Sequence, residues 1–229
     1  MNAELVSCVI AVYNGERYLA EAIDSALGQS HPSIEVIIAD DGSTDGTPGI
    51  AQGYDDRVRY FRQENAGPSA ARNLGIDHAR GGSIGFLDAD DRWTREKIEL
   101  QLARIRATEG VGAVFGHAQN FWVDELKHEA EKFKDHRIAR PLPAYVAGSM
   151  LVTCEALDQI GRFDAKLRHS EIEDWVLRAR GAGVGVDLME EVLLERRLHP
   201  QNMSRNQAAD SREEYLRLIK KSLDQKRGR

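Results

Sequence analysis

The sequence predicts an α/β fold in which helices flank a mostly parallel β-sheet. A continuous run of apolar and small residues at 6–12 is typical of a strand that is covered on both faces. Comparable runs follow at residues 34–39, 58–61 and 84–87, and segments with helical periodicity separate them. Strands that are joined by helices pair in parallel, with right-handed crossovers. A βαβαβαβ series of this kind predicts a Rossmann-like sheet.

The helices between these strands are predicted from apolar spacing and from residues that break helices. The first has apolar residues at i, i+3, i+4, i+7 and i+8, which are Leu19, Ala22, Ile23, Ala26 and Leu27. Gly42 permits a turn after the second strand, and Ser43, Thr44 or Asp45 can cap a short helix there. Residues 68–79 form the next predicted helix, which Gly81-Gly82 stops.

The second half of the chain is less regular. Trp93 and the stripe of Ile98, Leu102 and Ile105 predict a helix that packs on the core, with Asp91 as its cap. The charged stretch 124–140 is interpreted as a solvated excursion or mobile loop. The remaining predicted elements are a strand at 111–116, helices at 153–160 and 170–182, short strands at 184–187 and 192–198, and a helical tail from Asp210.

Length and composition indicate one large globular domain, with or without an appendage. The 229 residues are 41% hydrophobic and 30% charged, with a net charge of −6, so a nucleic-acid footprint is not expected. Cys8 and Cys154 lack a C-x-x-C spacing, which favours a reducing setting. No apolar run reaches 18 residues and the N-terminus has no basic region. These features predict a cytoplasmic protein.

Two acidic clusters follow buried strands and therefore fall at the same edge of the predicted sheet. Asp40-Asp41 ends one strand, and Asp88, Asp90 and Asp91 end another. In parallel sheets, ligands bind outside the carboxyl ends of the strands. Carboxylate ligands favour a hard divalent ion such as Mg²⁺ or Mn²⁺. The alternative is a solvated acidic turn that caps the next helix.

The second half offers further candidate residues, each with a structural alternative. Glu173 and Asp174 lie in the first turn of a predicted helix, where the dipole favours acids, but a carboxylate there could also act as a general base. Trp175 could pack in the core or stack on a sugar ring. His199, after the last strand, could be an ordinary surface histidine, a metal ligand or a phosphate contact.

Taken in order, these segments resemble the family 2 glycosyltransferases of the GT-A fold. The segments that carry the resemblance are residues 9–15, 36–45, 71–76, 86–91, 161–164 and 173–175, and the resemblance runs from about residue 5 to about residue 205. It implies a nucleotide-sugar-binding half at about 1–110, a smaller acceptor-side and catalytic half at about 111–205, and a C-terminal helical tail at 206–229. Many members have a proline before the valine of the first strand, where this chain has Ala11.

The resemblance also implies a role for each matching residue. The donor nucleotide would be held by Ala11, Tyr13, Asp40, Asp41, Arg72, Asn73 and Asp88. Asp90 would bind Mn²⁺ or Mg²⁺, with Asp88 and His199 as further metal ligands. Asp174 would be the catalytic base, and Glu173 and Trp175 would lie on the acceptor side.

The implied function is an inverting glycosyltransferase of polysaccharide or glycoconjugate synthesis. Its donor would be a nucleotide-diphosphate sugar, with UDP as the expected nucleotide, and its acceptor a saccharide or lipid-linked saccharide. The absence of a Q-x-x-R-W motif and of a membrane segment argues against a processive synthase. A sugar nucleotidyltransferase and a catalytically silent nucleotide-sugar-binding subunit remain as alternatives. The basic tail predicts a weak peripheral contact with the inner face of a membrane.

Overall fold

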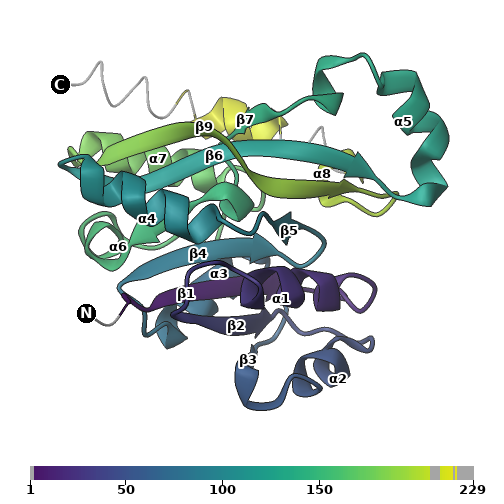
Figure 1. Ribbon diagram of the computed structural model, residues 1–229, viewed down its shortest axis with the longest axis horizontal. Coiled ribbons are helices and arrows are strands. Elements are labelled where there is room, and N and C mark those ends of the chain that lie inside the picture. The colour runs from purple at the N-terminus through teal and green to yellow at the C-terminus, as the bar shows by residue number, and fades with distance from the viewer. Residues whose placement is uncertain (1–2, 207–211, 219, 221–229) are drawn as a thin grey trace.

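The computed structural model describes residues 3–206, 212–218 and 220, and these form one curled sheet with helices on both faces (Figure 1). The strand order is β3-β2-β1-β4-β8-β6-β9-β5, and β7 pairs with β6. The strands are β1 (Val6–Val12), β2 (Ile34–Asp40), β3 (Val58–Arg62), β4 (Ser83–Asp88), β5 (Arg92–Trp93), β6 (Val111–Trp122), β7 (Leu142–Ala144), β8 (Leu151–Thr153) and β9 (Gly185–Leu198).

The four strands predicted for the first half pair in parallel with one another, and β6 and β9 of the second half also pair in parallel. β1 pairs in parallel with β2 and with β4, and β2 pairs in parallel with β3. In the register of β1, Val12 lies beside Asp40 and Ala11 lies beside Asp88. The ends of β2 and β4 therefore meet at one edge, as expected for a predominantly parallel α/β sheet.

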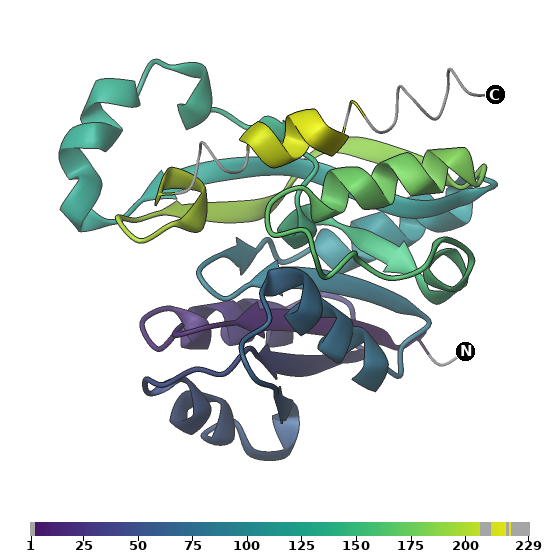
Figure 2. The ribbon, with the colours of Figure 1, turned by 180° about the vertical axis from the view of Figure 1, so that it is seen from behind.

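Helices cover the two faces of the sheet in two groups. The helices are α1 (Leu19–Leu27), α2 (Thr47–Gln52), α3 (Pro68–His78), α4 (Lys97–Ala107), α5 (Lys127–Phe133), α6 (Cys154–Ile160), α7 (Glu171–Gly181) and α8 (Met203–Asn206). Figure 1 shows α1 and α4 in front of the sheet, and the view from behind in Figure 2 shows α3, α6 and α7 on the opposite face.

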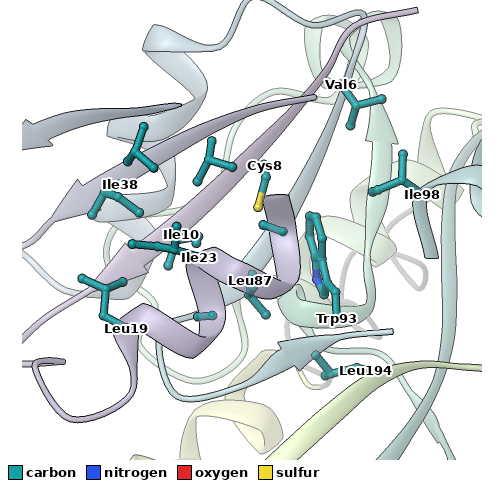
Figure 3. Close-up of a cluster of buried hydrophobic side chains, with 14 of the residues drawn as sticks. Val6, Cys8, Ile10, Leu19, Ile23, Ile38, Leu87, Trp93, Ile98 and Leu194 are labelled. Carbon is teal, nitrogen blue, oxygen red and sulfur yellow. The ribbon is translucent and has the colours of Figure 1, made fainter. Parts of the chain in front are cut away.

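Each face has its own hydrophobic core. On the α1 and α4 face, the fully buried Ile10, Ile23 and Ile98 pack with Trp93 and Leu87, as Figure 3 shows. On the other face, Phe86, Phe115 and Trp175 are the largest fully buried side chains. Because β1, β2 and β4 are largely buried on both sides, their sequences are mostly continuous apolar runs rather than alternating ones.

Several predicted boundaries differ from the structure. The last two predicted short strands form one strand, β9, which follows β6 through shifts of register near Phe115 and His117. These shifts let the strand pass through the exposed Glu190 and Glu191, which lie between the two predicted strands. The strand predicted at 111–116 likewise continues to Trp122 because β9 pairs along its length. The short strands β7 and β8 were not predicted.

The segment after the acidic cluster also differs. Trp93 belongs to β5, which pairs with β9, and the helix begins only at Lys97. Asp91 does not cap that helix, because its carboxylate accepts a hydrogen bond from the backbone N–H of Arg197 at 2.8 Å. The charged stretch 124–140 is solvated as predicted, but it is largely helical and contains α5.

The C-terminal part is described only in pieces. Residues 212–218 are helical. The predicted membrane contact depends largely on Lys221, Lys226, Arg227 and Arg229, which lie outside the described residues. Within the described ranges, no helix combines the length and the apolar character that crossing a bilayer requires.

Candidate active site

A cavity of about 740 Å³ opens at the carboxyl ends of β1 and β4, where the sheet places its acidic residues. The loop after β1, the N-terminus of α3, the loop after β4 and the segment after β9 form its wall. Predicted site residues in this wall are Ala11, Tyr13, Arg72, Asp88, Asp90 and His199. The sheet therefore gathers residues that lie more than 180 positions apart in the sequence.

Asp88 ends β4 and is held by Arg72 from α3. The guanidinium Nη2 of Arg72 donates to the Asp88 carboxylate at 2.7 Å. Arg72 can reach it because α3 packs closely on β1: a Cβ at Gly75 would lie 2.2 Å from Cγ1 of Val9. Only glycine permits this approach without displacement. The Asp88 side chain remains 36% exposed, so the carboxylate faces the cavity while its Arg72 partner is buried.

Asp90 is the acid that contacts the C-terminal half of the chain. Its Oδ2 lies 2.9 Å from His199 Nε2 and accepts from Asn202 Nδ2 at 3.1 Å. Asn202 in turn holds the segment in place, because its Oδ1 accepts the backbone N–H of His199 at 2.7 Å. The His199 ring also lies 5.1 Å from the ring of Tyr18.

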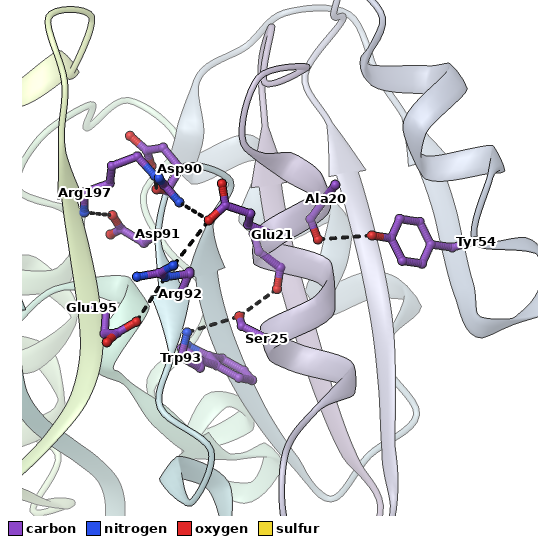
Figure 4. Close-up of polar contacts among 11 residues, drawn as sticks. Ala20, Glu21, Ser25, Tyr54, Asp90, Asp91, Arg92, Trp93, Glu195 and Arg197 are labelled. Atoms are coloured by element: carbon purple, nitrogen blue, oxygen red, sulfur yellow. Dashed lines mark hydrogen bonds and ion pairs between the residues drawn. The ribbon is translucent and has the colours of Figure 1, made fainter. Parts of the chain in front are cut away.

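Asp91 and Arg197 tie residues 88–91, here called the acidic loop, to β9. Arg197 donates its Nε to the backbone carbonyl of Asp90 at 2.9 Å and its Nη2 to Glu21 at 2.8 Å. Figure 4 shows Glu21 reaching from α1 to both Arg197 and Arg92, with Asp91 beside Arg197. Burial, with the charges of Asp90 and Asp88, raises the pKa of Asp91. Asp91 is thus buried, and its hydrogen bond with the Arg197 backbone fixes the acidic loop to β9.

The loop after β1 forms the opposite wall of the cavity. Tyr13 is 54% exposed there, which leaves its ring available to a ligand. Asn14 has a φ of 52°, and its Oδ1 accepts the backbone N–H of Thr44 at 2.8 Å. Because asparagine tolerates this left-handed conformation, the loop turns back and is fixed to the loop after β2.

Asp40 and Asp41 do not line the cavity. Asp40 is fully buried, accepts the Ser43 backbone N–H at 2.7 Å and also accepts the Tyr60 hydroxyl. Asp41 accepts the backbone N–H groups of Ala66 and Gly67 at 2.9 and 2.8 Å. In this structure both carboxylates shape the loops beside the cavity, and the predicted contact with the donor nucleotide remains a prediction.

Asn73 faces away from the cavity although it follows Arg72. Its side chain donates to the carbonyl of Phe163 at 2.9 Å and accepts that residue's N–H at 3.2 Å. The amide therefore clamps α3 to the loop before α7. Asn73 therefore does not line the cavity, and its predicted contact with the donor nucleotide remains a prediction.

The acids of α7 point in different directions. Asp174, the predicted base, accepts from Arg178 Nε at 2.7 Å, one turn along the helix, and lies outside the cavity wall. Glu173 is not part of the wall either, and burial, with the nearby Glu171 and Glu214, raises its pKa. Glu171 instead binds Arg72 and so belongs to the acidic loop's network.

Trp175 packs in the core. Its side chain is fully buried, and its indole N–H donates to the carbonyl of Gly161 at 3.0 Å. No part of the ring is exposed to a sugar, which excludes the predicted acceptor stacking in this structure. The physical reason is the helical period, which places Trp175 on the same buried face as Ile172 and Ala179.

The donor set at the acidic loop fits a hard divalent cation. Asp88 and Asp90 supply carboxylate oxygens, and His199 supplies an imidazole nitrogen within 2.9 Å of Asp90. Mg²⁺ and Mn²⁺ prefer oxygen ligands, and imidazole suits first-row metals. Within the described ranges, the structure contains no compact group of three acidic, histidine or cysteine ligands. The roles of Asp88, Asp90 and His199 as metal ligands therefore remain predictions.

Sequence reasoning missed several residues of this site. Asn202 and Tyr18 make or flank the contacts of the acidic loop, yet neither belongs to a motif that was considered. Glu171 begins the same acidic turn as Asp174, but it was given no role of its own, and the structure pairs it with Arg72. Tyr18 and Asn202 had no signal in the sequence, because only the folded chain brings them beside Asp90.

Comparison with known proteins identifies the family of the chain. A model of the family described as glycosyl transferase family 2 matches residues 7–163. TuaG of Bacillus subtilis, whose name refers to teichuronic acid biosynthesis, is 44% identical over 102 residues, which cover 43% of this chain and 40% of TuaG.

Two solved structures share the fold. TarS from S. aureus in complex with UDP-GlcNAc aligns with a TM-score of 0.68 and 18% identity, over 86% of this chain and 60% of TarS. The mannosyltransferase PcManGT from Pyrobaculum calidifontis, in complex with GDP-Man and Mn²⁺, aligns with a TM-score of 0.69 and 18% identity, over 90% of this chain and 61% of PcManGT. Both likenesses concern the fold. Because the family model covers most of the chain, the protein belongs to the family 2 glycosyltransferases.

Proposed function

We propose that the protein transfers a sugar, with inversion, from a nucleotide-diphosphate donor to an acceptor hydroxyl. The observation that carries the proposal is the convergence of Asp88, Asp90, Arg72 and His199 on one cavity at the sheet edge. Ligands of open α/β sheets bind at this place. Family membership supplies the reaction class, and the cavity supplies a place for the donor.

Asp90 and His199, with Asp88 beside them, are proposed to hold Mn²⁺ or Mg²⁺. The cation would neutralise the diphosphate leaving group as a Lewis acid. Asn202 and the Arg197 backbone then keep the acidic loop in place, through hydrogen bonds of 3.1 and 2.8 Å. Arg72 holds Asp88, and its guanidinium is part of the wall that the diphosphate would face.

The donor nucleotide is proposed to lie between the loop after β1 and α3. Ala11 and the exposed Tyr13 form one side of that space and Arg72 the other. UDP is the expected nucleotide, and the fold also occurs in complexes with UDP-GlcNAc and with GDP-Man. The choice of base therefore needs a binding experiment.

The acceptor is proposed to be a saccharide or lipid-linked saccharide of polysaccharide or glycoconjugate synthesis. The name of TuaG supports this context. Asp174 remains the proposed base because of its place in the family motif. Its ion pair with Arg178 would have to rearrange before the carboxylate could reach an acceptor hydroxyl. An inverting reaction needs one such base and in-line attack.

A thermal-shift screen of nucleotide sugars with Mn²⁺ tests the donor directly. Ligands that bind only the native state raise the melting temperature. A rise with one class of nucleotide sugar, followed by slow release of nucleoside diphosphate, supports the transferase. Release of pyrophosphate would instead support a sugar nucleotidyltransferase. Binding without any release over long incubation would favour a silent nucleotide-sugar-binding subunit.

The variant Asp90→Ala tests the metal site. It removes the carboxylate that contacts His199 and Asn202, so nucleoside-diphosphate binding should lose its dependence on Mn²⁺. Isothermal titration with UDP and with GDP, with and without Mn²⁺, measures this. If Asp90→Ala binds either nucleotide with unchanged metal-dependent affinity, Asp90 is not the metal ligand.

A further inference from the structure

Three charged side chains form a row that leads from the core to the cavity. Arg72 donates Nη1 to Glu171 at 2.5 Å and Nη2 to Asp88 at 2.7 Å. Glu171 and Arg72 are 7% and 6% exposed, whereas the Asp88 side chain is 36% exposed. The row therefore begins at a buried acid of α7, passes through α3 and ends at the acidic loop.

The inner pair is poorly suited to a purely stabilising role. Within the described part of the chain, Arg72 Nε and Glu171 Oε2 are buried without a hydrogen-bond partner. Unpaired buried polar atoms cost about 1–3 kcal/mol each, and buried ion pairs often contribute less than apolar residues of the same size. An ion pair with these unpaired buried atoms points to a requirement for charge at this position.

The charges of Glu171, Arg72 and Asp88 explain why a negative charge is required at Glu171. Arg72 carries one positive charge and touches two carboxylates, so the row has a net charge of −1. Without the charge of Glu171, Arg72 alone would neutralise Asp88, and the row would have no net charge. A divalent cation beside Asp88 and Asp90 would then find the charge of Asp88 already neutralised by Arg72.

We propose that Glu171 is a positioning residue that offsets the charge of Arg72 and thereby keeps Asp88 available to a divalent cation. Glu171 acts through Arg72 and does not itself line the cavity. The inference rests on the proposed metal site and adds to it a residue from the other half of the chain. It separates Glu171 from Asp174, which lies three residues later and pairs with Arg178.

The first test is Mn²⁺ binding to the full chain, measured by electron paramagnetic resonance with the metal alone. Glu171→Gln keeps the size of the side chain and one acceptor for Arg72 but removes the charge. We expect the dissociation constant for Mn²⁺ to rise by about tenfold or more, because one unit charge is lost near a dication. Glu171→Asp restores the charge and should recover part of the affinity.

A matched control removes a carboxylate of another ion pair. Asp187→Asn breaks the contact with Arg104 on α4, outside the cavity wall, and should leave Mn²⁺ affinity unchanged. Thermal unfolding without metal shows whether each variant folds. Loss of affinity in Glu171→Gln at an unchanged melting temperature separates the charge effect from a structural one.

The double variant Arg72→Gln with Glu171→Gln provides the sharpest result. It removes both inner charges and leaves Asp88 with its own charge of −1, so Mn²⁺ affinity should return toward that of the wild type. If Glu171 only supports the fold, the double variant binds Mn²⁺ no better than Glu171→Gln, and the proposal is wrong. Wild-type affinity in Glu171→Gln also overturns it.

The two proposals fail in different ways. A wild-type protein that binds Mn²⁺ but no nucleotide sugar contradicts the proposed function, while the comparison of Glu171 variants still decides the role of the row. A wild-type protein that binds no Mn²⁺ contradicts the metal site and, with it, the role of Glu171.

Discussion

Lys97 gives the protein a pH-dependent stability that can be calculated from its surroundings. The side chain is fully buried, its Nζ donates to Gln101 at 2.6 Å and to the carbonyl of Met150 at 3.2 Å, and it lies 4.4 Å from the Trp93 ring. Burial lowers the pKa of Lys97 from 10.5 to about 7. Unfolding returns the amine to water and to its ordinary pKa.

The sign follows from proton binding. Between pH 7 and 10.5 the unfolded state keeps the proton on Lys97 while the folded state releases it, so the free energy of unfolding rises with pH. From pH 7 to 8.5 the expected gain is about 1.5 kcal/mol. Burial also raises the pKa of the nearby Cys8 thiol, whose opposite effect begins only as the unfolded thiol ionises near pH 9. The window from pH 7 to 8.5 therefore isolates the amine.

The assay is urea unfolding of the wild type and of Lys97→Met at pH 7 and at pH 8.5. Methionine fills a similar volume without a titratable group, so the variant should lack the gain. The difference between the two pH dependences is the quantity of interest, because groups far from Lys97 titrate alike in both proteins and the neighbouring Cys8 thiol stays protonated in the folded state over this window. A difference below about 0.3 kcal/mol would show that Lys97 stays protonated in the fold, and the reasoning from burial would be wrong.

Three further predictions concern the base, the packing of α3 and the C-terminal helix. Asp174→Asn should reduce transfer by at least about 100-fold while calorimetric nucleotide affinity stays within about twofold; near-normal turnover would exclude Asp174 as the base. Gly75→Ala should destabilise the protein by about 1–3 kcal/mol, because the new Cβ would meet Val9, whereas Gly49→Ala, with nothing within 4 Å, should be neutral or slightly stabilising in thermal unfolding. Burial acts to raise the pKa of Glu214, but hydrogen bonds from three backbone amides before α7 hold it below its usual value. Glu214→Gln should therefore cost about 1 kcal/mol at neutral pH and less as the pH falls through the range of the carboxyl, whereas an equal cost at pH 3 and pH 7 would contradict this.

The parallel half of the sheet could be predicted from sequence because its signals are local. A strand buried on both faces is continuously apolar, and residues 6–12 and 34–39 show this pattern without help from any distant residue. The order of strands then places Asp40 and Asp88 at one edge. The ordered motifs indicated the family for the same reason, since each is a short local segment.

The short strands and the long strand β9 could not be predicted in this way. β5 has two residues and β8 has three, so neither shows a period, and both exist because a neighbouring strand supplies hydrogen bonds. The two predicted strands left out Glu190 and Glu191, but pairing between β9 and β6 continues past these exposed residues through shifts in register.

The sequence by itself determined the α/β sheet, the family and the acidic loop at the sheet edge. Tertiary structure decided which of the acidic residues line the cavity. Glu171 and Asp174 lie in one turn of α7 and look alike in sequence, yet one binds Arg72 and the other binds Arg178. Asp88 and Asp90 open onto the cavity, whereas Asp40 is enclosed by the loop after β2 and by Tyr60 on β3. A local pattern specifies the residue type and the face of an element, but the partner of a carboxylate depends on which distant element packs against it.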